Sequence, residues 1–558
     1  INENCKIVGS YAFSSCENLT NIIIPDSVMI LGTGAFYGCK KLSNVTIGSG
    51  ITQINGLTFR DCVSLKQITI PSKATYIGYF AFGGCGRLDS IVIPENVETI
   101  VTGAFSGCVS LKKVTLSNKL TRIESSVFSG CRLLDSITIP NSVTNIERYA
   151  FENCTALTTI VIPNSVTEIG EGAFKGCSSL ESITLPFIGA SKTAENGYDQ
   201  VFGYIFGYHT SSERYYGYVG TTFQYRGEQY YHYWIPASLK TVIITNNVTS
   251  INSYAFNNCD KLTNITLPDN LTRINCKAFS NCTSLKNITF PNGVTHIDGF
   301  DGCTSLENII FPEGVIMIGD FERCTSLKSV IIPDSVTFLS QRAFFGCSNL
   351  KDVVIGNGVT QIGECTFLGC SELMSVTLGS SITKIEDEAF YGCYRLVQVI
   401  NRSKLNKIEK NNLYGYVGYY ALSIENEKTS DITYQGDYAF FSSEGVNYLI
   451  NYFGEDKNLT LPKNYNGKGY KINRYAFYGR VSVEKVIIPE GVTKIGENAF
   501  LYCTALKRVS IPKTVSEIGD GAFGYTVENS ELKLTDDFTM SVFSGSAGDK
   551  YAKSATIE

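Results

Sequence analysis

Residues 157–177 read Leu157-Thr-Thr-Ile160-Val-Ile162-Pro163-Asn-Ser-Val166-Thr-Glu-Ile169-Gly170-Glu-Gly-Ala173-Phe174-Lys-Gly176-Cys177. The first six residues, of the form L-x-x-I-x-I, place three apolar side chains on one face of a short strand. Pro163 then ends the strand, because proline cannot donate to a ladder. A second, weaker extended segment carries Val166 and Ile169, and the turn after it buries Phe174 and Cys177. Such a unit has no core of its own, so it must stack on copies of itself.

The unit recurs along the chain. Its cysteine returns every 23 residues, with two intervals of 21, in two runs and one late copy: Cys16, Cys39, Cys62, Cys85, Cys108, Cys131, Cys154 and Cys177, then Cys259, Cys282, Cys303, Cys324, Cys347, Cys370 and Cys393, then Cys503. The phenylalanine three residues earlier marks 18 coils: Phe13, Phe36, Phe59, Phe82, Phe105, Phe128, Phe151, Phe174, Phe256, Phe279, Phe300, Phe321, Phe344, Phe367, Phe390, Phe477, Phe500 and Phe523. The repeat predicts one elongated solenoid rather than three or four globular domains.

Composition excludes several classes of function. The 558 residues carry 47 Lys and Arg against 52 Asp and Glu, and the net charge of -5 excludes the basic surface that nucleic-acid binding requires. No apolar run approaches the roughly 18 residues that cross a bilayer. Three histidines leave little room for histidine metal sites or general bases, and the motifs of nucleophile elbows, zinc proteases and phosphate loops are absent. The sequence therefore predicts no enzyme, no cofactor and no metal site.

The 19 cysteines follow the repeat rather than a disulfide framework. Sixteen lie on the ladder of coils, and Cys5, Cys276 and Cys365 do not. Metal ligands must converge on one point, whereas residues of successive coils are strung along a stack. Neighbouring coils bring Cα atoms within disulfide range, but their parallel Cβ vectors suit pairing poorly. We therefore expect buried structural thiols. The alternative is a few bridges, such as Cys365 with Cys370 or Cys276 with Cys282.

The outward side chains of the L-x-x-I-x-I strands form columns that face solvent. The third outward position is nearly always β-branched: Ile23, Thr46, Thr69, Val92, Thr115, Thr138, Val161, Thr184, Thr266, Thr289, Ile310, Ile331, Val354 and Thr377. This column is explained by the strand preference of β-branched residues on a half-exposed sheet. A ligand-binding ridge is the other interpretation.

Two inserts interrupt the repeat and divide the chain. The expected parts are repeat block one at 1–186, an aromatic insert at 187–238, repeat block two at 239–400, a second β-rich insert at 401–470, repeat block three at 471–527 and a C-terminal capping tail at 528–558. Two coils, at 297–300 and 318–321, lack two residues before the phenylalanine. There we expect a local change of curvature and nothing chemical.

The first insert departs from the composition of the repeat, because 15 of the 50 residues from Phe187 to Pro236 are aromatic. Alternation in 201–208 and in 223–235 predicts a β-hairpin. Tyrosine and tryptophan suit glycan stacking and protein hot spots, while packing on the flank of the solenoid is the plainer interpretation. The candidate binding residues are Tyr204, Tyr208, Tyr215, Tyr216, Tyr218, Tyr231, Tyr233 and Trp234.

The second insert and the ends carry further local signals. Strands are predicted at 431–441 and 446–452, and 459–462 imitates a repeat strand. Residues 546–554 predict a short capping helix. The sequence begins inside a coil without a methionine or a signal peptide, and no cell-wall sorting motif follows the helix. We therefore expect a trimmed or processed piece of a longer protein.

The repeat unit resembles the BspA-like, or treponemal-type, leucine-rich repeats. The resemblance implies a right-handed solenoid of about 18 coils of 23 residues, dominated by β-structure and short turns or 3-10 segments, with a parallel sheet on its concave side. It also implies a secreted or cell-surface protein of anaerobic bacteria or protists that acts in adhesion.

We therefore expect an extracellular recognition scaffold that binds protein or glycan ligands on host or neighbouring cells through its repeat surface. One alternative is a glycan-binding module that uses the aromatic insert. Another is a structural spacer in a larger surface protein. The oligomeric state is left open by the sequence.

Overall fold

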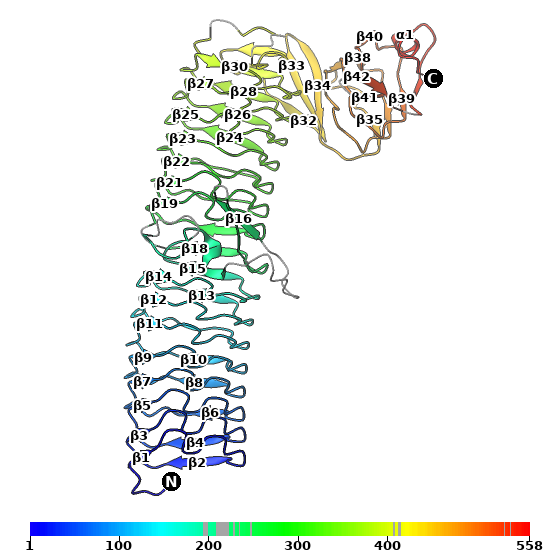
Figure 1. Cartoon of the computed structure of the whole chain (residues 1–558). Coiled ribbons are helices and arrows are strands. Elements are labelled where there is room, and N and C mark those ends of the chain that lie inside the picture. The colour runs from blue at the N-terminus through cyan, green and yellow to red at the C-terminus, as the bar shows by residue number, and fades with distance from the viewer. Residues whose placement is uncertain are drawn as a thin grey trace. The chain divides into compact units, whose positions relative to one another are not determined.

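The computed structural model describes residues 1–193, 199–207, 222–226, 229–233, 235–245, 248–405, 408–410, 415–528, 531–535 and 537–557. The chain forms a parallel-strand solenoid of about 21 turns with little helix. Figure 1 shows the strands of successive coils stacked on one another in unit 1. It comprises two compact units, Ile1–Thr325 (unit 1) and Ser326–Glu558 (unit 2). The repeat solenoid predicted from the sequence is confirmed.

Most coils of unit 1 contribute to two columns of strands. The first column holds the L-x-x-I-x-I strands: β2 (Asn21–Ile24), β4 (Asn44–Ile47), β6 (Gln67–Ile68), β8 (Ser90–Val92), β10 (Lys113–Thr115), β13 (Thr159–Val161), β15 (Ser182–Leu185), β18 (Thr241–Ile244) and β20 (Asn264–Thr266). The second column holds the shorter strands of the V-T-x-I segment: β1 (Ile7–Val8), β3 (Ile30–Leu31), β5 (Gln53–Ile54), β7 (Tyr76–Ile77), β9 (Thr99–Ile100), β11 (Arg122–Ile123), β12 (Asn145–Ile146), β14 (Glu168–Ile169), β19 (Ser250–Ile251), β21 (Arg273–Ile274), β22 (His296–Ile297) and β23 (Met317–Ile318).

The register of these columns reproduces the sequence repeat. All pairs within them are parallel, and Ile7 stands opposite Ile30, one repeat away. Across a shortened coil, His296 stands opposite Met317, an offset of 21 instead of 23. The loss of two residues is therefore absorbed in the turn, and the ladder continues.

The core of unit 1 is a column of stacked phenylalanines. The rings of Phe36 and Phe59 lie 5.5 Å apart at an angle of 3°, and those of Phe82 and Phe105 lie 5.3 Å apart at 2°. These four side chains are fully buried. Full burial of a large apolar side chain contributes about 1.5–3 kcal/mol, so the stacking of coils on one another supplies the core that a single coil lacks.

The ladder thiols lie beside this column. Fifteen of the 16 are buried and Cys16 is half-buried, which confirms that part of the prediction. A thiol typically donates to the carbonyl oxygen of the preceding coil's phenylalanine. Cys62 donates to Phe36 and Cys131 to Phe105, with Sγ–O distances of 3.2 and 3.3 Å.

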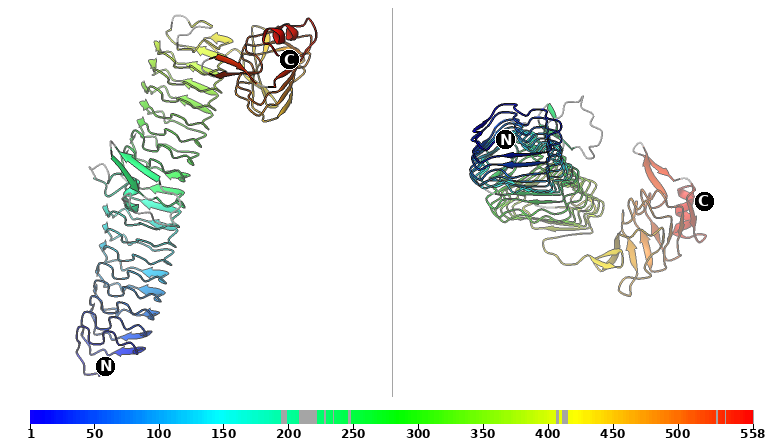
Figure 2. Two further views of the ribbon diagram at one scale, coloured as in Figure 1. Left: turned by 45° about the vertical axis from the view of Figure 1, so that its right-hand side comes forward. Right: turned by 90° about the horizontal axis from the view of Figure 1, so that it is seen from below.

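The first insert folds differently from the prediction at 201–208. Phe202–Phe206 form the 3-10 helix η1 rather than a strand. The helix takes the place of a turn in the stack, because Phe174 donates its N–H to the carbonyl of Ile205 and Phe202 donates to that of Ala255. The hairpin lies wholly in the second half of the insert, where β16 (Thr222–Arg226) pairs antiparallel with β17 (Gln229–Tyr233) at the side of unit 1 (Figure 2).

Unit 2 also contains parallel strands of both kinds, in sheets that differ before and after the second insert. The L-x-x-I-x-I strands form two sheets: β24 (Ser329–Ile332), β26 (Asp352–Ile355), β28 (Ser375–Leu378), β30 (Gln398–Asn401) and β31 (Ser423–Glu425), then β35 (Asn458–Thr460), β37 (Lys485–Ile487), β39 (Arg508–Ser510) and β43 (Thr539–Ser541). The shorter strands fall into an early and a late group: β25 (Phe338–Leu339), β27 (Gln361–Ile362) and β29 (Lys384–Ile385), then β36 (Tyr470–Ile472), β38 (Val492–Ile495) and β40 (Glu517–Ile518). β41 (Tyr525–Glu528) and β42 (Glu531–Leu534) form a terminal hairpin.

In the second insert the strand predicted at 446–452 is confirmed as β34 (Val446–Tyr452), whereas the strand predicted at 431–441 is divided by a turn into β32 (Thr433–Gln435) and β33 (Tyr438–Ser443). β33 pairs antiparallel with both β32 and β34. The repeat-like stretch becomes β35, which pairs parallel with β37, and β31 pairs parallel with β30. Insert residues thus build turns of their own without the phenylalanine signature, which is why counting that signature gives fewer turns than the structure has.

The predicted capping helix is confirmed as α1 (Ala547–Ser554). The hydroxyl of Ser546 accepts the N–H of Asp549, which satisfies a free donor at the start of the helix. Tyr551 donates its hydroxyl to the carbonyl of Phe523 and its ring covers the last phenylalanine of the column.

Candidate binding surface

The outward face of the first strand column in unit 1 is open to solvent, as predicted. The β-branched third position is 68% exposed at Ile23, 65% at Val92, 59% at Val161 and 84% at Ile310. Threonines stand between these aliphatic side chains, so the column presents a line of β-branched groups that mixes apolar and hydroxyl contacts.

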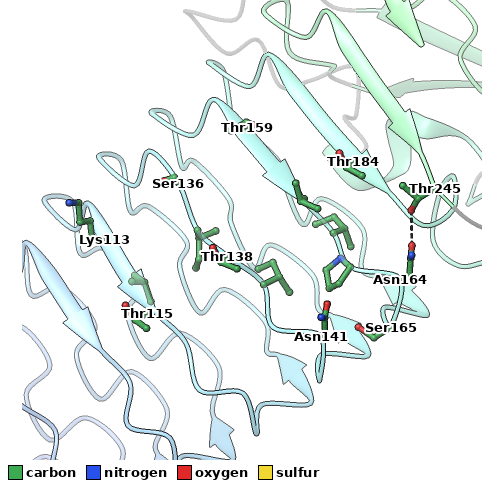
Figure 3. Close-up of a pocket in the computed structure, with 16 residues that line it drawn as sticks. Lys113, Thr115, Ser136, Thr138, Asn141, Thr159, Asn164, Ser165, Thr184 and Thr245 are labelled. Carbon is green, nitrogen blue, oxygen red and sulfur yellow. Dashed lines mark hydrogen bonds between the residues drawn. The ribbon is translucent and has the colours of Figure 1, made fainter. Parts of the chain in front are cut away.

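A hollow of about 950 Å³ lies in this face, over the coils of 113–184 (Figure 3). It forms where the sheet is interrupted, because residues 136–139 belong to no strand and β10 and β13 belong to separate sheets. Figure 3 shows its labelled side chains standing on successive coils. The labelled lining residues are Lys113, Thr115, Ser136, Thr138, Asn141, Thr159, Asn164, Ser165, Thr184 and Thr245.

The hollow carries little charge, and its lining is rich in hydroxyl and amide groups. Lys113 carries the one charge among its sixteen lining residues. Thr245 donates its hydroxyl to the side-chain oxygen of Asn164 at 2.6 Å, which fixes one wall. The hydroxyl oxygen of Ser165 is buried without a hydrogen-bond partner among the described residues. The hollow therefore offers hydrogen bonds and apolar contact but no strong electrostatic attraction.

The corresponding face of unit 2 is partly covered, which corrects the expectation that all outward positions meet solvent. Met374, Thr377, Val397 and Gln398 are outward by sequence, yet each is at most 9% exposed. Met374 and Val397 pack against Ala439, Phe441 and Ile450 of the second insert. β33 and β34 thus lie over these coils, whereas Ile331, nearer the start of unit 2, is 66% exposed.

The aromatic residues predicted as binding candidates do not form one described surface. Tyr204 is half-buried within η1, and its carbonyl oxygen accepts the N–H of Gly172. Tyr233, at the end of β17, is 2% exposed and so is packed. Tyr231 lies on β17. Tyr208, Tyr215, Tyr216, Tyr218 and Trp234 lie outside the described residues.

A second hollow, of about 400 Å³, lies at the base of the first insert. Its lining is mainly polar, with Ser191, Lys192, Gln200, Thr249 and Asn252. Phe187 and Ile188 add an apolar part. This hollow combines residues of the insert with those of a regular coil.

Sequence reasoning missed a cluster of tyrosines in unit 2. The ring of Tyr394 lies 4.4 Å from that of Tyr478 and 4.9 Å from that of Tyr475, and Tyr420 lies 5.7 Å from Tyr475. Burial raises the pKa of Tyr394 and of Tyr420. These rings cover one another, so the cluster chiefly holds the second insert against its neighbouring coils. The signal available in the sequence was the dense run Tyr416-Val-Gly-Tyr-Tyr420.

The thiols that were candidates for bridges point to other partners. Cys276 Sγ lies 3.4 Å from Asp320 Oδ2, and Cys282 donates to the carbonyl of Phe256. Cys365 Sγ lies 3.8 Å from Glu388 Oε2, and Cys370 donates to the carbonyl of Phe344. In the described chain these four cysteines are free thiols.

Among the described residues, none of the helices has the length and apolar character needed to traverse a bilayer. A comparison with curated proteins finds no match. Several solved structures are similar. A leucine-rich repeat protein from Bacteroides ovatus is 27% identical, with 70% of this chain and 81% of that chain covered and a TM-score of 0.36. A leucine rich cell surface protein from Faecalibacterium prausnitzii is 29% identical, with 66% and 82% covered and a TM-score of 0.27.

The leucine rich repeat protein of Treponema pallidum is 30% identical, with 31% of this chain and 71% of that chain covered and a TM-score of 0.25. The sequence model of the BspA type leucine rich repeat region matches at residues 1–109, 75–191, 228–351, 339–451 and 457–547, in six copies. These matches span most of the chain, and the stacked coils described above are the structure that such repeats form. The chain belongs to the BspA type leucine rich repeat family.

Proposed function

We propose that this protein is an extracellular, non-catalytic recognition scaffold that binds protein ligands of host or neighbouring cells through the outward face of its first strand column. The observation that carries the proposal is the row of exposed β-branched side chains that runs into the hollow at 113–184. Membership in the repeat family supports a binding role and a location at the cell surface.

The physical basis of binding would be shape and hydrogen bonding rather than charge. The stacked coils hold the face rigidly, so little conformational entropy is lost when a ligand docks. The hollow supplies hydroxyl and amide partners, and Val161 and Val92 supply apolar contact next to them. Because net charge is small, association should depend weakly on ionic strength.

Two arginine substitutions on the same column test this proposal. Val161→Arg places a bulky charge in the hollow, whereas Ile23→Arg makes the same change at a somewhat more exposed position that does not line the hollow. The purified chain is screened against arrays of extracellular proteins and of glycans. We expect micromolar binding to at least one protein, lost in V161R and kept in I23R. Binding to no protein would instead favour a spacer role, and equal binding by both variants would move the site elsewhere.

A glycan-binding role for the first insert is the second candidate, favoured by the polar hollow of about 400 Å³ at the base of the insert. Residues 199–207 belong to the stack, so a clean test replaces only 208–234 by a glycine–serine linker and keeps η1. If Tyr231 or the other aromatic candidates within 208–234 form a glycan site with this hollow, the linker variant loses glycan-array signals while the coils remain folded. An unchanged glycan profile would contradict this role.

A further inference from the structure

Three side chains that bind metal ions converge at the two shortened coils of unit 1. Cys276 offers an exposed thiol, and Asp298 and Asp320 offer half-buried carboxylates from the next two coils. One donor atom of each lies within 4.8 Å of the other two. This is the one grouping of three such side chains in the part of the chain that the structure describes.

The shortening of the coils brings these residues together. Gly299, at φ +85°, packs so closely on the turn of Cys276 that a Cβ there would lie 2.4 Å from the N atom of Ala278. This close packing places Asp298, the residue before Gly299, next to the thiol of Cys276. In the following coil, Asp320 adopts φ 48°, and its carbonyl accepts the N–H of Phe300 at 2.7 Å. The ligands are thus held by backbone contacts between coils rather than by flexible loops.

The mixture of donors separates this cluster from an ordinary group of surface carboxylates. Cys276 is not a ladder cysteine, and its sulfur approaches Asp320 Oδ2 at 3.4 Å instead of a backbone carbonyl. With zinc–sulfur and zinc–oxygen bonds of about 2.3 and 2.0 Å, a tetrahedral site has a sulfur–oxygen edge of about 3.5 Å. The thiol and carboxylate, hydrogen-bonded to each other, thus already stand at the separation that two ligands of one zinc ion require.

The electrostatics of the cluster favour a cation. Burial and the neighbouring Asp320 raise the pKa of Asp298 to about 7. Burial and both aspartates raise the pKa of Cys276 to about 12, and Lys277 is the one positive group that opposes them. A divalent cation placed among these three side chains would offset the repulsion between them.

We propose that Cys276, Asp298 and Asp320 bind a divalent cation of the zinc class, with at least one coordination position left for water or for a ligand. A thiolate with two carboxylates suits zinc better than magnesium or calcium, which prefer oxygen ligands alone. Three protein ligands and an open position also describe the zinc sites that engage a further molecule. Because the metal binds sulfur as a thiolate, binding releases the proton of the Cys276 thiol to the buffer.

The test uses the full chain, reduced and stripped of metal with a chelator. Zinc binding is measured by calorimetry in two buffers of different ionisation enthalpy, and cobalt is used as a spectroscopic probe of the sulfur ligand. We expect one equivalent of zinc bound with proton release, and a sulfur-to-cobalt charge-transfer band. Cys276→Ser should abolish the band. Asp298→Asn should weaken zinc binding by more than about tenfold, since losing even a residue that only supports a ligand costs about 10- to 100-fold.

Cys365→Ser is the matched control. Its thiol is also off the ladder and lies 3.8 Å from a carboxylate, but no third ligand converges there among the described residues. This variant should bind zinc and cobalt as the unmodified chain does. The proposal fails if the unmodified chain binds no zinc at micromolar concentrations, if C276S keeps the cobalt band, or if C365S loses it. Asp298→Asn, which preserves shape, gives the affinity readout independently of C276S.

Discussion

Single residues show why the repeat uses cysteine and phenylalanine together. A thiol such as Cys131 fits a fully apolar site and still donates a weak hydrogen bond to the carbonyl of Phe105 in the preceding coil. A larger residue would crowd the site. A more polar residue would leave a buried hydroxyl group that needs a hydrogen-bond partner. The column of cysteines is thus a packing device that also joins coils.

The buried thiols predict a loss of stability at alkaline pH. Burial raises the pKa of Cys108 and of Cys177 from 9.0 to about 12. Below pH 9 the folded and unfolded chains both hold these protons, so the buried thiols make their full contribution to the free energy of unfolding. Between pH 9 and 12 only the unfolded chain loses them, and each thiol lowers the free energy of unfolding by up to about 1.4 kcal/mol per pH unit. Urea titrations across this range measure the slope.

The control for this slope is the double variant Cys108→Ala/Cys177→Ala. Its unfolding free energy should decline less steeply with pH than that of the unmodified chain. An identical slope would show that the thiols do not carry the effect.

A buried ion network in unit 2 makes Glu372 a sensitive position. Its Oε1 lies 3.1 Å from Arg395 Nη1 and 2.8 Å from Arg480 Nη2, and its other oxygen accepts from Asn451. Burial alone would raise the pKa of Glu372, but the two arginines and these hydrogen bonds lower it. Arg480 stands where the ladder expects a cysteine, so the network marks the place where the stack resumes after the second insert.

Replacing Glu372 by leucine should destabilise the protein by about 3–5 kcal/mol, because it leaves the buried guanidinium of Arg395 without a counter-charge. Glu386→Gln, which removes a carboxylate from an exposed ion pair with Lys384, should leave the denaturation midpoint unchanged. Denaturant titration of both variants compares them. Equal midpoints would mean that the network does not hold the junction.

Whole elements show how inserts can become part of a solenoid. Phe202–Phe206 read as a strand from their alternation, yet the stack required a turn at this level and the segment became η1. β31 and β35 instead pair with repeat strands because their apolar pattern matches the neighbouring coil. The local apolar pattern therefore determines the secondary structure of a segment only when the neighbouring coil offers a place of matching geometry.

The cover over unit 2 is tested by one matched pair. Val397→Asp places a carboxylate beneath β33 and β34, where Val397 is fully buried, and should cost more than about 3 kcal/mol as an unpaired buried charge. Ile331→Asp makes the same kind of change at a 66% exposed position and should cost little. Thermal melts of the two variants give the comparison. Similar melting temperatures would show that the insert does not close over these coils.

At the scale of the molecule, unit 1 is a one-dimensional assembly in which each coil depends on its two neighbours. Phe128 is fully buried between two coils, whereas Phe13 is only half-buried near the end of the stack. Phe128→Ala should therefore destabilise the unit by about 3–5 kcal/mol and Phe13→Ala by clearly less. Hydrogen exchange should show faster opening around residue 128 in the first variant. Equal effects would contradict nearest-neighbour stability.

Most of this fold was predictable because the repeat fixes it many times over. Each copy of Phe, Cys and the L-x-x-I-x-I stretch predicts the same inward-facing and outward-facing positions. The capping helix was predictable as well, because Ser546 caps its N-terminus. The convergence of Cys276, Asp298 and Asp320 was not predictable. Each lies 22 residues after the one before it, and only the shortened turns bring the three side chains together. The hollow likewise follows from an interruption of the sheet at 136–139 that no residue type announces.

The hydrogen bonds between coils run along the stack, as in the pairing of β2 with β4 or β13 with β15. A tensile load applied to the ends of unit 1 would act on these bonds in series, and the terminal coil would yield first. Each coil that peels away frees 23 residues, or about 80 Å of contour length. Unit 1 would then behave as an extensible tether that lengthens stepwise under shear and keeps its remaining coils folded.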